Sequence, residues 1–197
     1  TDIMARGPIA ITMGEPAGIG GEILLKAWNS RREFNLPSFF AVDDPNRLRA
    51  LGNTLGMDIP VAVIDDPAQA PGVFADALPV IANALPSPVT MGQPNPANTD
   101  AVVGSIAKAV AMAMDGSASA VGPNTIHKAV LYAGGFKSPG HTEFLGELTG
   151  STTPPVMMLA CPGLRVVPVS IHIPLAKAVA DLNTPSIVAI GQACAKG

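Results

Sequence analysis

The fold is decided by the stretch from Ile9 to Ile23, which reads Ile-Ala-Ile-Thr-Met-Gly-Glu-Pro-Ala-Gly-Ile-Gly-Gly-Glu-Ile. Its first residues are apolar and mostly β-branched, as in a buried strand, and the residues from Glu22 onward favour a helix. A glycine-rich bend joins the two. In α/β proteins such a bend turns backbone N–H groups and a helix N-terminus toward a ligand at the edge of the sheet. The stretch therefore predicts an α/β protein with a ligand site at this loop.

The rest of the chain continues the alternation of strands and helices. Strands are predicted at 9–13, 38–42, 61–64, 80–84, 117–121, 156–160 and 165–170, and helices at 22–30, 46–55, 98–114, 125–133, 142–148, 174–180 and 185–195. This order predicts a mostly parallel sheet, and the turn at Pro162-Gly163 predicts an antiparallel pair, so we expect a mixed sheet. A boundary is expected near residues 121–125, with a first α/β lobe at 1–123 and the start of a second at 124–197.

Composition limits the classes of partner. The chain has 197 residues, 48% hydrophobic and only 14% charged, which supports a packed core and excludes disorder. The net charge of −3, with no basic cluster, argues against nucleic acid. No apolar run approaches the roughly 18 residues of a membrane span, and residues 1–6 lack the apolar core of a signal peptide. Cys161 and Cys194 are predicted to be free, buried thiols in a reducing cytoplasm.

The first loop allows three interpretations. Gly18-Ile19-Gly20 supplies two glycines of a dinucleotide-binding fingerprint, and Asp43 ends the next predicted strand, about 20 residues further on. However, Ile23 occupies the position of the third glycine, and Pro16 lies inside the turn. The loop could also be a purely structural turn. We favour the third interpretation, in which Glu15 and the loop backbone border an active-site cleft.

Three other segments carry polar side chains suited to a site. His141 and Thr142 begin a predicted helix, where they could donate hydrogen bonds to a phosphate or carboxylate, although Thr142 could equally cap the helix. His172 follows a predicted strand at the carboxyl edge of the sheet, where a single histidine is more often structural than a ligand. Lys128, next to His127, could contact an anionic substrate or lie on a solvated helix face.

Two of these segments resemble a known family. Gly14-Glu15-Pro16-Ala17-Gly18-Ile19-Gly20, followed by Glu22, is similar to the opening signature of the 4-hydroxythreonine-4-phosphate dehydrogenases, and Gly140-His141-Thr142-Glu143-Phe144 matches their substrate-binding signature. The likeness extends along essentially the whole chain, including 90–93, 157–160 and 171–175. It implies an α/β/α arrangement like that of isocitrate and isopropylmalate dehydrogenases, with two lobes and a cleft, in a cytoplasmic homodimer.

The resemblance also implies roles for particular residues. His141, Thr142 and Lys128 would bind the substrate, Glu15 and His127 would line the cleft, and His172 would be one of three ligands of a divalent metal such as Zn, Mg or Co. No general base is assigned. The implied reaction is the oxidation of the secondary alcohol of 4-phosphooxy-L-threonine by NAD or NADP. The product is a 3-keto acid that decarboxylates, on the route to pyridoxal phosphate.

The sequence departs from the family in two places. The segment after Pro123 usually reads Ile/Val-Asn/His-Lys, whereas here Asn124-Thr125 precedes Ile126-His127-Lys128. This leaves open a related dehydrogenase for another 4-phosphorylated hydroxy acid or a cis-diol. A catalytically silent phosphate-binding lobe, or a protein like the phosphate acyltransferases, is a further alternative.

The second departure concerns the metal ligands. The family's other two metal-binding histidines lie in segments reading Asn-Pro-His-Ala-Gly-Glu and Tyr-His-Asp-Gln, which this sequence lacks. A self-contained site built from His127, His141 and His172 is disfavoured, because the family gives His141 to the substrate. We therefore expect the chain to be an N-terminal portion.

Overall fold

The computed structural model describes residues 7–138, 141–151, 155–171 and 173–196. The chain divides into two compact units, Thr1–Ser138 and Pro139–Gly197. Residues 124–138, which we expected in the second lobe, belong to the first unit, because Leu131 is buried against Met13 and Val102. The observed division therefore falls after Ser138 rather than after residue 123.

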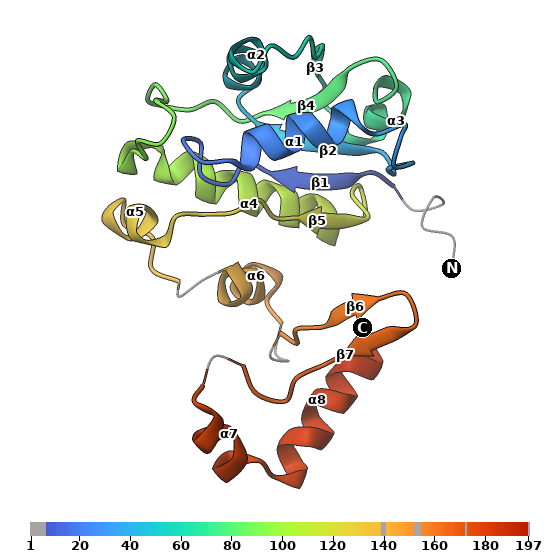
Figure 1. Cartoon of the computed structure of the whole chain (residues 1–197), viewed down its shortest axis with the longest axis vertical. Helices are drawn as coiled ribbons and strands as arrows, with labels where there is room; N and C mark the ends of the chain where they lie inside the picture. The colour runs from blue at the N-terminus through green and yellow to red at the C-terminus, as the bar shows by residue number, and fades with distance from the viewer. Residues whose placement is uncertain (1–6, 139–140, 152–154, 172, 197) are drawn as a thin grey trace. The chain divides into compact units, whose positions relative to one another are not determined.

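The first unit is built around a five-stranded sheet in the order β3-β4-β2-β1-β5 (Figure 1). Its strands are β1 (Ile9–Thr12), β2 (Phe39–Asp43), β3 (Val61–Val63), β4 (Leu78–Ala82) and β5 (Ala120–Gly122). All of the strand pairings described for this sheet are parallel, and Ile9 lies opposite Phe39 on one side and Ala120 on the other. The predicted α/β fold with a mostly parallel sheet is confirmed.

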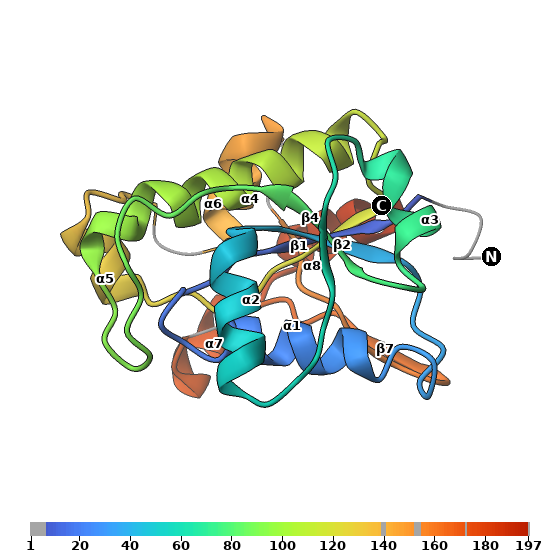
Figure 2. The same cartoon turned by 90° about the horizontal axis from the view of Figure 1, so that it is seen from above.

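Helices cover both faces of this sheet (Figure 2). The helices of this unit are α1 (Gly20–Asn29), α2 (Pro45–Thr54), α3 (Ala70–Val73), α4 (Thr99–Met114) and α5 (Lys128–Ala133), with 3-10 turns at Pro67–Gln69 and Pro96–Asn98. Helices α1 and α2 lie on one face and α4 on the other. Alternate side chains of β2 serve the two faces: Phe39 joins the cluster with α1 and α2, and Phe40 joins the cluster with α4. This double cover explains why all five residues of β2 are buried.

The strand order reverses at β1. The chain leaves β1 through α1 to reach β2 on one side, and it returns through α4 to place β5 on the other side. In open parallel sheets, ligands bind beyond the carboxyl ends of the strands at such a reversal. The glycine-rich loop between β1 and α1 follows this reversal point directly.

The second unit contains α6 (His141–Thr149), β6 (Leu159–Cys161), β7 (Leu164–Val166), α7 (Leu175–Asp181) and α8 (Thr184–Lys196). Strands β6 and β7 form the predicted antiparallel pair, turning at Gly163 with a φ of 80°. The prediction that this pair would make the main sheet mixed is wrong, because the hairpin forms a separate two-stranded sheet. The prediction of buried thiols is also wrong: both cysteines are free, but Cys161 is exposed and Cys194 only half-buried.

Among the described residues, no helix is both long and apolar enough to cross a membrane.

Candidate ligand site at the carboxyl edge of the parallel sheet

The loop after β1 requires glycine at its second position, Gly14. Gly14 has a φ of 66°, which side chains rarely adopt. A Cβ atom there would lie 2.7 Å from the Cβ of Asn124 and 2.7 Å from the carbonyl oxygen of Thr125. The loop backbone therefore passes in close contact with the segment that follows β5.

Hydrogen bonds join this loop to Asn124 and Thr125. The backbone N–H of Glu15 donates to the carbonyl of Thr125 (2.8 Å). Asn124 donates twice to Thr12, from its backbone N–H to Oγ1 (3.0 Å) and from Nδ2 to the carbonyl (2.9 Å). The two residues that depart from the family pattern thus connect the ends of β1 and β5. Sequence reasoning missed this role, because Thr12 and Asn124 are 112 positions apart.

Glu15 is buried within its own loop, with 7% of its surface exposed. Its Oε1 accepts the N–H of Ala17 (3.0 Å), and its carbonyl accepts the N–H of Gly18 (3.0 Å). The carbonyl of Ala17 in turn accepts the N–H of Gly92 (2.8 Å). The loop is therefore held in a single turn by its own carboxylate and by the segment that precedes α4.

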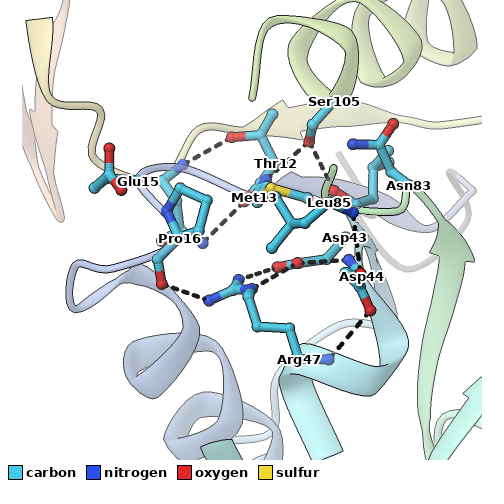
Figure 3. A network of polar contacts seen from close by, with 12 residues as sticks. Thr12, Met13, Glu15, Pro16, Asp43, Asp44, Arg47, Asn83, Leu85 and Ser105 are labelled. Carbon is cyan, nitrogen blue, oxygen red and sulfur yellow. Dashed lines mark hydrogen bonds and ion pairs between the residues drawn. The ribbon is translucent and has the colours of Figure 1, made fainter. Parts of the chain in front are cut away.

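A buried ion pair contacts the same loop from α2 (Figure 3). Asp43 is completely buried at the end of β2, and Arg47 binds it through Nε (3.1 Å to Oδ1) and Nη2 (2.5 Å to Oδ2). Arg47 also donates from Nη1 to the carbonyl of Pro16 (3.0 Å). Burial raises the pKa of Asp43 above its usual range, and the Arg47 charge opposes that rise. Because Asp43 is enclosed, it cannot bind a ribose hydroxyl, and this excludes the dinucleotide interpretation of the loop.

Asp44 connects α2 to the segment after β4. As the N-cap of α2, its Oδ1 accepts the N–H groups of Asn46 (2.8 Å) and Arg47 (3.1 Å), while Oδ2 accepts the N–H of Leu85 (3.0 Å). Desolvation acts to raise the pKa of Asp44. The three backbone donors and the Arg47 charge outweigh it, so the pKa is lowered.

A groove of about 460 Å³ lies between α2 and residues 85–91. We call it the α2 groove. Its lining is mostly apolar, with a few polar groups, as in small-molecule sites. The lining residues are Asp44, Asn46, Arg47, Ala50, Leu51, Thr54, Leu85, Pro86, Ser87, Pro88, Val89 and Met91.

The other predicted site residues lie in two groups. His127 is exposed at the N-cap of α5, where its Nδ1 accepts the N–H of Val130 (3.4 Å), and Lys128 is the exposed first residue of that helix. In the second unit, His141 and Thr142 open α6, as the sequence predicts. His172 lies outside the described residues. Within the ranges the structure describes, no group of three His, Cys, Asp or Glu side chains could surround a metal ion.

The geometry of the first unit defines a class of protein. A glycine-rich loop meets the segment after β5 at the point where a parallel strand order reverses, which is the arrangement of α/β ligand-binding enzymes of the doubly wound type. The model of the family described as pyridoxal phosphate biosynthetic protein PdxA matches residues 36–197. The chain belongs to this family, and the resemblance inferred from the sequence is confirmed.

Individual relatives agree with the family match. The chain is 43% identical over 195 residues to a 4-hydroxythreonine-4-phosphate dehydrogenase of Bradyrhizobium diazoefficiens, covering 93% of the chain and 56% of the relative. It is 47% identical over 189 residues to the protein of that name from Methylorubrum populi, covering 92% and 53%. A crystal structure of the Klebsiella pneumoniae dehydrogenase of that name superimposes with a TM-score of 0.83 at 30% identity, covering 94% of this chain and 57% of that chain. The chain spans about half the length of the curated relatives it matches.

Proposed function

We propose that this chain is part of a dehydrogenase that oxidises the secondary alcohol of 4-phosphooxy-L-threonine in pyridoxal phosphate biosynthesis. A hydride would pass from the carbinol carbon to NAD or NADP while the hydroxyl proton leaves to a base, and the resulting 3-keto acid would lose carbon dioxide. The observation that carries the proposal is the match to dehydrogenases of that specificity over more than nine-tenths of the chain.

His141 and Thr142 are the proposed binding residues for the substrate phosphate. They open the nine-residue helix α6, where the first backbone N–H groups lack helical partners and the macrodipole favours an anion. An imidazole N–H and a hydroxyl would add two further donors. Fixing the phosphate in this way would orient the carbinol hydrogen toward the nicotinamide.

Two threonines of α6 provide a matched test of this role. Thr142 lies at the N-terminal end, whereas Thr149 lies at the other end and donates to the carbonyl of Leu145 (2.9 Å). In the full gene product, Thr142→Ala should raise KM for 4-phosphooxy-L-threonine about tenfold, the loss expected for a hydrogen bond to a charged group. Thr149→Ala should leave KM within about twofold. NAD reduction measured by absorbance gives both values, and equal effects of the two substitutions would refute the assignment.

Lys128, Glu15 and His127 are the proposed site residues of the first unit. Lys128 is exposed beside the segment that contacts Glu15. Its ammonium could therefore bind an anion without the cost of burying a charge. Lys128→Met should raise KM for the phosphorylated substrate, and the effect should shrink in high salt because exposed charges are screened. An unchanged KM would show that Lys128 does not bind the substrate and lies only on a solvated helix face.

A divalent metal such as Zn, Mg or Co, with His172 as a ligand, is proposed on the resemblance alone. The described residues provide no group of three ligands, so we derive no catalytic step through a metal. The test is the metal content of the purified full gene product. His172→Ala should lower it, whereas His127→Ala, which alters an exposed helix cap, should not. Equal metal content in both variants would remove His172 from the site.

A related substrate is the second candidate. Asn124 and Thr125 differ from the family pattern and contact the loop of Glu15, which supports a specificity for another 4-phosphorylated hydroxy acid or a cis-diol. Comparing kcat/KM across these substrates with NAD and NADP decides between the two candidates. A protein that binds phosphorylated ligands but reduces neither cofactor would instead be a silent phosphate-binding lobe.

A cytoplasmic homodimer is proposed on the resemblance, and the mass in solution tests the dimer.

A further inference from the structure

We propose that Arg47 is a positioning residue that sets the conformation of the loop 14–20 and thereby the geometry of the active site. The inference rests on the proposed function only for its kinetic test. Arg47 contacts no reacting group in this assignment. It acts through the carbonyl of Pro16, the residue next to Glu15.

All three guanidinium nitrogens of Arg47 donate hydrogen bonds. Nε and Nη2 bind the two carboxylate oxygens of Asp43, which fixes the plane of the guanidinium and aims Nη1 at the Pro16 carbonyl. The Arg47 side chain is 7% exposed and that of Asp43 is fully buried. A lysine has one nitrogen and no fixed plane, so it cannot make the same three bonds.

The energetics of burial also point to a role for the Asp43–Arg47 pair beyond stability. A buried ion pair is often no more stabilising than apolar side chains of the same size, because both charges lose their hydration. Stability of the core is therefore a weak reason for this pair. Apolar side chains at these positions could fill the space between β2 and α2, but they could not bind the loop carbonyl. The bond to Pro16 is what the charged pair adds.

The start of α1, directly after the loop, also lies close to Arg47. A Cβ atom on Gly21, which follows the loop at the start of α1, would lie 2.9 Å from Nη1 of Arg47 and 2.8 Å from Cδ2 of Leu51. The first turn of α1, which the loop leads into, thus contacts α2 with no space for a side chain between them. The loop already donates to the carbonyl of Thr125 and accepts the N–H of Gly92, so Arg47 gives it a third attachment, from a third segment of the chain.

The experiment compares a charge-neutral replacement of the pair with a control on the same helix. Asp43→Asn with Arg47→Met removes both charges, so neither is left buried alone, and keeps an acceptor for the Asp44 N–H. Arg47→Lys retains the positive charge but lacks the planar guanidinium that binds both oxygens of Asp43. The control is Arg49→Met, since Arg49 also donates from α2 to a carbonyl, that of Val61 (2.9 Å), away from the loop.

The first readout is amide exchange in the full gene product. The N–H groups of Ala17 and Gly18, both bonded to Glu15, should exchange at least about tenfold faster in the double variant and in Arg47→Lys, but not in Arg49→Met. The second readout is kinetic: kcat should fall about tenfold in the first two variants and stay unchanged in the control. If loop exchange matches the control, the positioning role is wrong.

The two readouts also separate this inference from the proposed function. Fast exchange with unchanged kcat would overturn the link between the loop and the site. A wild-type protein without dehydrogenase activity would refute the proposed function, and the exchange result would still decide whether Arg47 sets the loop conformation.

Discussion

Ser105 should contribute to stability far more than an ordinary serine of an α-helix. It lies on α4 with no exposed surface, where its Oγ accepts the N–H of Met13 (2.9 Å) and donates to the carbonyl of Val42 (2.7 Å). One hydroxyl thus connects the end of β1, the end of β2 and the helix that covers them. Met13 is the residue directly before Gly14, so the same contact supports the start of the ligand loop.

The cost of Ser105→Ala can be worked from these contacts. The substitution leaves the buried N–H of Met13 without its acceptor, a loss of about 1–3 kcal/mol, and removes a donor from Val42. The better helix propensity of alanine returns less than about 0.7 kcal/mol. We therefore expect a net destabilisation of about 2 kcal/mol. With a typical urea m-value of about 2 kcal/mol/M, the midpoint should move down by roughly 1 M.

The assay is urea unfolding followed by the fluorescence of Trp28. It is the chain's single tryptophan, 4% exposed on α1, so its signal reports the first unit. Ser117→Ala is the control: the Ser117 Oγ donates to Met112 (3.1 Å) at a partly buried site, and its loss should cost less than about 0.5 kcal/mol. Equal midpoints for the two variants would refute the reasoning, because water would then satisfy the Met13 N–H.

Three further predictions concern Gly14 of the loop, the Asp44 N-cap of α2 and the hairpin of the second unit. Gly14→Ala should destabilise the first unit by more than about 2 kcal/mol, because it adds a clash with Thr125 to the strained φ. Gly116→Ala, at a φ of 84° with open space around it, should cost only about 1–2 kcal/mol. Urea unfolding followed by Trp28 fluorescence measures the stability of both variants, and equal costs would exclude the clash. Because the folded pKa of Asp44 is lowered, its charge stabilises the fold above the unfolded pKa of about 3.9, and this contribution is lost as pH falls through the folded pKa. Asp44→Asn should therefore lower the urea midpoint at neutral pH, and its difference from the wild-type midpoint should disappear in acid. A difference that does not change with pH would contradict this. Amides of β2, buried throughout, should exchange only on global unfolding, whereas those of the exposed β6–β7 hairpin should be slowed by less than about tenfold; equal protection would be inconsistent with its exposure.

The sequence by itself determined the fold class and much of the element order of this protein. Local patterns suffice for this: the β-branched run at β1, the proline at the start of α2 and the apolar spacing of α4 each fix a local conformation, and they are read without knowing what they contact. The start of α6 at His141-Thr142 was predicted in the same way, from a signature in consecutive residues. Such features depend on neighbours within a turn or two.

Only the tertiary structure decided which distant residues meet. Asp43, which suits a ribose-binding role when read along the chain, is enclosed by Arg47, and the unusual Asn124-Thr125 pair proves to connect β1 with β5. The antiparallel hairpin was predicted, but its separation from the main sheet was not, because hydrogen bonding between strands depends on where the chain returns. Burial and pairing across a sheet are properties of the assembled core, and one-dimensional spacing carries no direct record of them.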